Sequence, residues 1–120
     1  GILACLLMAE LVATERKSLG HILKAIEKQT GPFITDRINV RVEPKNKEKL
    51  LKKLAAGPKK IGAFPVQEFV TKDGFKFILP GGEWVAFRAS GTEPVFRCYI
   101  EAKSQAHYRK LRKACEALLQ

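Results

Sequence analysis

Short apolar segments separated by tight-turn sequences fill the C-terminal half of this chain, and they limit its fold more than any other feature. Asp73-Gly74 and Gly81-Gly82 favour the positive backbone angles of two-residue hairpins. A Ser-Gly-Thr turn follows at residues 90–92. Segments joined in this way run antiparallel to one another. The sequence therefore predicts a meander with strands around residues 66–71, 75–79, 83–88 and 95–101.

A further strand and two amphipathic helices flank the meander. Apolar residues on alternate positions after residue 34 predict a strand with one covered face, and Pro44 ends it. Asn46 is expected to cap the next helix and Ser104 the last one. The order strand, helix, hairpin strands, helix is typical of an α+β domain with helices packed on one face of an antiparallel sheet.

The first 31 residues have a different pattern. Residues 2–13 are apolar except Glu10, which predicts a helix that requires burial on nearly every side. The stretch is shorter than the roughly 20 residues of a membrane span, and it lacks the basic lead of a signal peptide. Ser18 can cap a second helix, which ends at Gly31-Pro32. We therefore expect residues 1–31 to be the end of a preceding domain and residues 32–120 to form the α+β domain.

Net charge indicates which partners the chain can attract, and the cysteines indicate its redox environment. The chain has 22 Lys plus Arg against 12 Asp plus Glu, a net charge of +10. Such a surface attracts polyanions, anionic lipids or phosphorylated small molecules, and charge alone does not choose among them. Cys5, Cys98 and Cys115 are odd in number and widely spaced, which predicts reduced thiols in the cytoplasm. His21 and His107 lack partners at metal-ligand spacing, so no metal site is predicted.

Residues 88–94, Arg-Ala-Ser-Gly-Thr-Glu-Pro, carry most of the chemistry of the chain. Arg88 offers a planar fork of donors that suits phosphate oxygens. Ser90 and Thr92 add hydroxyl groups, and Gly91 allows consecutive amides to point into one concavity. The pattern predicts an oxyanion site, but the same residue types also close hairpins for conformational reasons. Spacing alone leaves both interpretations open.

Together with the segments 83–87 and 96–102, this loop resembles the C-terminal, fourth domain of the α-D-phosphohexomutases, the phosphoglucomutase and phosphomannomutase family. Residues 1–4 are also similar to the last helical stretch of that family's third domain. The resemblance implies a TATA-box-binding-protein-like fold for the domain. It also implies an isomerase that interconverts hexose 1-phosphate and hexose 6-phosphate by intramolecular phosphoryl transfer through a bisphosphorylated sugar.

The resemblance further assigns roles to individual residues. Arg88, Ser90, Gly91 and Thr92 match the positions that hold the sugar phosphate at the end that is not reacting. Glu93 also matches the pattern, but a carboxylate repels phosphate, so we expect it to support the loop. The catalytic phosphoserine, the magnesium ligands and the loop that selects the sugar belong to earlier domains of the family. This chain alone is therefore expected to be inactive, with a phosphorylated hexose and the earlier domains of the same polypeptide as its partners.

Two other functions remain open from the residues alone. A lysine cluster around the helix after Pro44 would suit a nucleic-acid backbone, but it lacks interleaved aromatic residues, which favours a solvated helix face. The cluster comprises Lys45, Lys47, Lys49, Lys52, Lys53, Lys59 and Lys60. A purely structural domain would use the sheet aromatics as core, namely Trp84, Phe87, Phe96 and Tyr99. Strand alternation places Arg97 on a sheet face away from the turn, and His107 is expected to be exposed and without a role.

Overall fold

The computed structural model describes residues 1–119 and divides into two compact units, Gly1–Pro32 and a second that begins at Phe33. The first unit contains α1 (Ile2–Glu15) and α2 (Leu19–Thr30). Ser18 caps α2 as predicted, with its hydroxyl oxygen 3.4 Å from the His21 amide nitrogen. Every residue of α1 remains at least partly exposed. No helix within residues 1–119 is long and apolar enough to cross a membrane.

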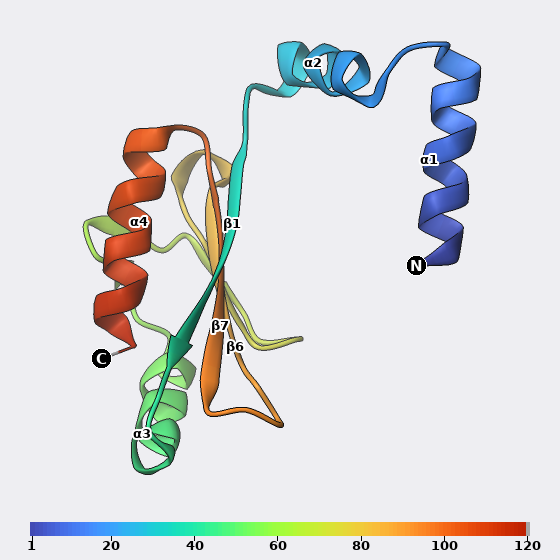
Figure 1. Cartoon of the computed structure of the whole chain (residues 1–120). Coiled ribbons are helices and arrows are strands. Elements are labelled where there is room, and N and C mark those ends of the chain that lie inside the picture. Colours follow the sequence, from blue (N-terminus) through green and yellow to red (C-terminus); the bar gives the residue numbers. More distant parts are fainter. Residues whose placement is uncertain (120) are drawn as a thin grey trace. The chain divides into compact units, whose positions relative to one another are not determined.

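The second unit is built on a five-stranded antiparallel sheet in the order β1-β7-β6-β5-β4. Its strands are β1 (Ile34–Arg41), β4 (Glu68–Val70), β5 (Phe75–Ile78), β6 (Trp84–Ala89) and β7 (Val95–Ala102). Helices α3 (Pro44–Ala55) and α4 (Gln105–Leu118) lie on the same side of this sheet (Figure 1). The predicted α+β architecture is confirmed. A small hairpin of β2 (Lys60–Ile61) and β3 (Phe64–Pro65) was not predicted.

The predicted N-terminal capping residues are correct for α2 and α4 but not for α3. Ser104 caps α4, with its hydroxyl oxygen 3.2 Å from the His107 amide nitrogen. The expectation that Asn46 caps α3 is wrong: the helix already begins at Pro44, and Glu43 occupies the N-cap position without a side-chain hydrogen bond to the helix. Proline suits the first helical position because its fixed φ is already helical and its missing N–H has no partner there.

The predicted two-residue hairpins are also longer than expected. Val70 pairs with Lys76, and Ile78 pairs with Trp84, so five residues separate each of these pairs. A 3₁₀ turn at Pro80–Gly82 fills the second connection, and in the first connection only Gly74 has a positive φ, 92°. The glycine signals therefore located both hairpins but not their lengths.

Strand alternation divides the sheet into two faces. The face toward α3 and α4 carries the core, in which residues with at most 1% exposure include Leu54, Phe77, Val85, Phe87, Phe96, Cys98, Ile100 and Leu111. Trp84 and Tyr99 occupy the intervening positions and are only half-buried, so two of the four aromatic residues predicted in the core lie on the opposite face. Trp84 is held there by a 2.7 Å hydrogen bond from its indole N–H to Glu101 and by the Lys76 ammonium 4.1 Å from its ring centre.

Two of the three cysteines lie inside this core. Cys98 on β7 and Cys115 on α4 are both fully buried, and both are free thiols. Contact with the Cys115 thiol and burial together raise the pKa of Cys98 above its ordinary value. The two thiols therefore lie where α4 packs against the sheet.

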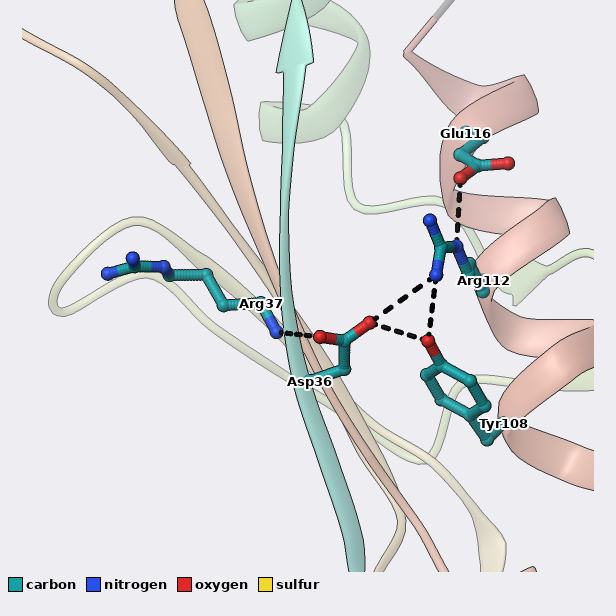
Figure 2. A network of polar contacts seen from close by, with 5 residues as sticks. All are labelled: Asp36, Arg37, Tyr108, Arg112 and Glu116. Carbon is teal, nitrogen blue, oxygen red and sulfur yellow. Dashed lines mark hydrogen bonds and ion pairs between the residues drawn. The ribbon is translucent and has the colours of Figure 1, made fainter. Parts of the chain in front are cut away.

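A polar network connects α4 to β1 (Figure 2). The Tyr108 hydroxyl donates to the Asp36 carboxylate at 2.5 Å, and Arg112 donates to the Tyr108 oxygen at 3.0 Å. Arg112 also donates to Glu116 at 3.1 Å. The hydrogen bond from Tyr108 is the main reason that the pKa of Asp36 is lowered. Arg37, the next residue of β1, directs its side chain to the other side of the strand.

A second polar contact joins α4 to the connection before β6. Glu83 is 3% exposed and accepts a 2.8 Å hydrogen bond from the Lys103 amide. His107 Nδ1 lies 3.0 Å from both oxygens of the same carboxylate. His107 is exposed, as expected, but its ring also contacts this buried acid, which the sequence did not predict.

Candidate functional site

The loop between β6 and β7 is closed by its own hydrogen bonds. The Ser90 amide donates to the Val95 carbonyl at 2.9 Å, and the Val95 amide donates to the Glu93 carbonyl at 2.8 Å. The Glu93 amide donates to the Ser90 hydroxyl oxygen at 3.2 Å. Ser90 is only 6% exposed. Its hydroxyl oxygen thus holds the turn together, while the hydroxyl proton remains available to another acceptor.

Gly91 and Thr92 form the exposed tip of the loop. Within residues 1–119, their amide N–H groups donate to no acceptor in the protein. The two residues border a concavity of about 210 Å³ together with Pro44, Lys47, Glu93 and Pro94. Two adjacent free amides in a loop that is otherwise internally bonded are suited to binding an anion.

Arg88 lies at the end of β6, and its guanidinium is 3.2 Å from the Asp73 carboxylate. Gly74 explains this proximity, since a Cβ atom at that position would come within 2.6 Å of the Phe87 carbonyl oxygen. The turn after β4 can therefore pack directly against β6, which places Asp73 beside Arg88. The Arg88 side chain is 56% exposed and free to turn toward another anion.

Arg88 does not line the same hollow as Gly91 and Thr92. It borders a larger concavity of about 560 Å³, whose wall also includes Lys72, Lys76, Trp84 and Tyr99. The structure thus brings Ser90, Gly91 and Thr92 together in one turn and holds the Arg88 guanidinium on Asp73. An anion bound by all four residues would require Arg88 to leave that carboxylate.

Arg97 lies closer to the loop than the sequence analysis expected. It is the direct cross-strand partner of Arg88, and its guanidinium lies 3.5 Å from the Glu93 carboxylate. The prediction that Arg97 faces away from the turn is therefore wrong. Counting the antiparallel register outward from residues 90–92 would have paired Arg88 with Pro94, so the turn sequence did not predict the observed pairing of Arg88 with Arg97. Glu93 thus contacts a cation beside the loop.

The site combines several oxyanion donors with two nearby carboxylates. The donors are the Arg88 and Arg97 guanidinium groups, the Ser90 and Thr92 hydroxyls and the two free amides. Asp73 and Glu93 balance the two arginines. Among residues 1–119, no group of three His, Cys, Asp or Glu residues is placed to hold a metal ion. The site therefore offers hydrogen-bond donors and positive charge to an anion.

Part of the lysine cluster has structural contacts. Lys47 donates to the Ser90 carbonyl at 3.0 Å, and Lys53 donates to the Leu118 carbonyl at 2.9 Å. The description of this cluster as a solvated helix face is therefore incomplete. Lys47 in particular connects α3 to the loop at residues 90–94.

Comparison with known proteins agrees with the loop sequence. The family model described as "Phosphoglucomutase/phosphomannomutase, C-terminal domain" matches residues 38–118. The chain belongs to this family. The match covers both the loop at residues 90–94 and helices α3 and α4, so the α+β unit is a phosphohexomutase C-terminal domain.

The relatives are longer mutases. The chain is 29% identical over 120 residues to a probable phosphoglucosamine mutase of Methanothermobacter thermautotrophicus, covering 100% of this chain and 25% of that protein. It is 52% identical over 40 residues to a phosphoglucomutase/phosphomannomutase of Thermococcus kodakarensis, covering 33% of this chain and 9% of that protein. A solved phosphoglucomutase/phosphomannomutase family protein from Burkholderia thailandensis aligns with a TM-score of 0.51 and 28% identity, over 78% of this chain and 19% of its own. The chain thus spans about a quarter of the length of the first relatives.

Proposed function

We propose that this domain holds the phosphate of a phosphorylated hexose at the end that is not reacting, within an enzyme that interconverts hexose 1-phosphate and hexose 6-phosphate. Arg88, Ser90, Gly91 and Thr92 bind the phosphate, and Glu93 supports the loop. The observation that carries the proposal is the pair of free amides at Gly91 and Thr92, in a turn closed by its own hydrogen bonds and flanked by arginines.

The energy of this anchor is sufficient for a useful role. A hydrogen bond to a charged group contributes about 1.5 to 3 kcal/mol, so several of them exceed the entropy cost of ordering the Arg88 side chain. Fixing the distant phosphate places the reacting oxygen against its donor, and such positioning lowers the barrier of the chemical step. Because a bisphosphorylated intermediate must bind in two orientations, a site that recognises phosphate and ignores the sugar is what the reaction requires.

Arg97 extends the proposed site. Its position opposite Arg88 allows both guanidinium groups to approach one phosphate, after Arg88 exchanges the Asp73 carboxylate and Arg97 the Glu93 carboxylate. Guanidinium groups bind phosphate oxygens in a planar, often bidentate arrangement. We therefore add Arg97 to the residues that bind the substrate.

The remaining parts of the enzyme are proposed to lie outside this chain. The phosphoserine and the magnesium ion of the family belong to earlier domains. The exposed apolar residues of α1, among them Ile2, Leu3 and Leu6, fit the proposal that residues 1–31 complete the preceding domain. The free cysteines fit a cytoplasmic setting.

The test is Arg88→Ala in the polypeptide that carries this chain. Losing one charged hydrogen-bond donor should lower kcat/KM about ten- to a hundredfold, with KM raised and kcat lowered together. Arg109→Ala is the matched control, because Arg109 is an exposed arginine on α4, on the opposite side of the sheet. Steady-state kinetics with glucose 1-phosphate would measure both variants, and unchanged constants for Arg88→Ala would remove that residue from the site.

A further inference from the structure

Lys47 contacts the back of the phosphate loop, and we propose that it is a positioning residue that aims the Gly91 amide at the bound phosphate. The inference rests on the proposed function and concerns the same site. Lys47 lies in the first turns of α3, and its ammonium is 3.0 Å from the Ser90 carbonyl oxygen. The contact is partly buried and links residues 43 positions apart in the chain.

The start of α3 is fixed beside the loop independently of Lys47. The Val42 amide, at the end of β1, donates to the Pro94 carbonyl at 2.9 Å. Pro44 then begins the helix two residues later, with a backbone angle that proline itself fixes. Lys47 therefore reaches the loop from a rigid base, and its contact with Ser90 follows from the fold.

Because the peptide group is planar, the contact of Lys47 with the Ser90 carbonyl also sets the direction of the Gly91 N–H. The carbonyl of Ser90 and the N–H of Gly91 belong to one planar trans peptide group, so they point in opposite directions. A Ser90 carbonyl oxygen held by the Lys47 ammonium turns the Gly91 N–H away from that ammonium. The Gly91 side of this peptide is otherwise free to rotate, because glycine lacks a Cβ atom.

The remaining contacts of Ser90 do not fix this peptide group. The Ser90 amide belongs to the preceding peptide and bonds to Val95, and the Ser90 hydroxyl oxygen accepts from Glu93. Among residues 1–119, Lys47 is the partner recorded for the Ser90 carbonyl. Removing its ammonium leaves the carbonyl to water and allows the peptide to turn, so the phosphate loses a donor that was already oriented.

A set of lysine variants in the polypeptide that carries this chain tests the inference. Lys47→Met removes the ammonium and keeps the apolar stem, whereas Lys47→Arg retains a donor of similar reach. Lys45→Met is the matched control, because Lys45 lies on the same helix but pairs with exposed Glu43 at 2.9 Å. The probe is inorganic phosphate, titrated by calorimetry at about 0.1 M and about 1 M sodium chloride. At the higher concentration, long-range charge effects are largely screened.

We expect Lys47→Met to weaken phosphate binding about tenfold at both salt concentrations, which corresponds to about 1.4 kcal/mol. Lys47→Arg and Lys45→Met should remain within about twofold of the wild type. In protein labelled with ¹⁵N-glycine, the heteronuclear NOE of the Gly91 amide should fall in ligand-free Lys47→Met and not in Lys45→Met. The Gly91 signal is assigned by its loss in Gly91→Ala.

The possible contrary results differ in what they overturn. If the wild type binds phosphate and Lys47→Met shows the same affinity and the same Gly91 NOE, the inference is overturned and the proposed function stands. A loss of affinity that disappears at high salt would indicate direct charge attraction by Lys47 and would also overturn the positioning role. Failure of the wild type to bind phosphate would overturn the proposed function and the inference together.

Discussion

Asp73 competes with phosphate for Arg88, and this competition gives a prediction of definite sign. The Arg88 guanidinium is 3.2 Å from the Asp73 carboxylate, with side chains 56% and 73% exposed. An ion pair as exposed as this contributes about 0.2 to 1 kcal/mol. A phosphate bound by Arg88 must replace that contact, and the Asp73 charge also repels it. Asp73→Asn should therefore tighten phosphate binding by about 1.5- to fivefold.

Calorimetric titration with inorganic phosphate measures this change. Glu68→Gln is the matched control, because it removes the charge of another exposed carboxylate on β4 of the same sheet. The effect of Asp73→Asn should vanish in an Arg88→Ala background, since the two changes act through one contact. Weaker binding by Asp73→Asn, or an equal gain with and without Arg88, would refute the exchange of partners.

Two further predictions concern the supports of the fold. Gly74→Ala should destabilise the domain by about 1 to 3 kcal/mol in urea unfolding, because its Cβ would clash with the Phe87 carbonyl at a φ of 92°. Gly81→Ala, at a φ of 79° with nothing within 4 Å, should cost less, and equal losses would exclude the clash as the cause. Tyr108→Phe should lower the stability by about 1 kcal/mol at pH ~7, because it removes the hydrogen bond that lowers the pKa of Asp36. That stabilisation is present above the unfolded pKa of Asp36, about 3.9, and is lost as the pH falls through the lower folded pKa. A stability difference between Tyr108→Phe and the wild type that persists below the folded pKa would contradict this role for Asp36.

The sequence predicted the elements whose patterns are local. Alternation and glycine turns predicted the meander, and Ser18 and Ser104 marked two helix starts correctly. The α3 start was missed because Asn46 and Pro44 are competing signals two residues apart, and the proline angle fits the first helical position. The hairpin of β2 and β3 is too short to produce an alternating pattern.

The candidate site was only partly predictable, because several of its contacts join distant segments. Ser90, Gly91 and Thr92 are consecutive in the sequence, so they could be recognised together as one set of hydrogen-bond donors. Asp73 and Lys47 reach the same region through the close approach of Gly74 and the start of α3, and neither approach has a local sequence signal. Arg97 was misplaced because face alternation was considered without the cross-strand register.

The buried thiols of Cys98 and Cys115 also allow the rate at which α4 separates from the sheet to be measured. A thiol-alkylating reagent needs an accessible thiolate. Both sulfurs are buried between α4 and the sheet, and the raised pKa of Cys98 suppresses its ionisation. Their alkylation therefore waits for α4 to leave β7, and its rate, compared with free cysteine, reports how often the domain opens. A phosphate ester that stabilises the closed domain would slow this alkylation, so mass spectrometry could follow ligand binding without any engineered label.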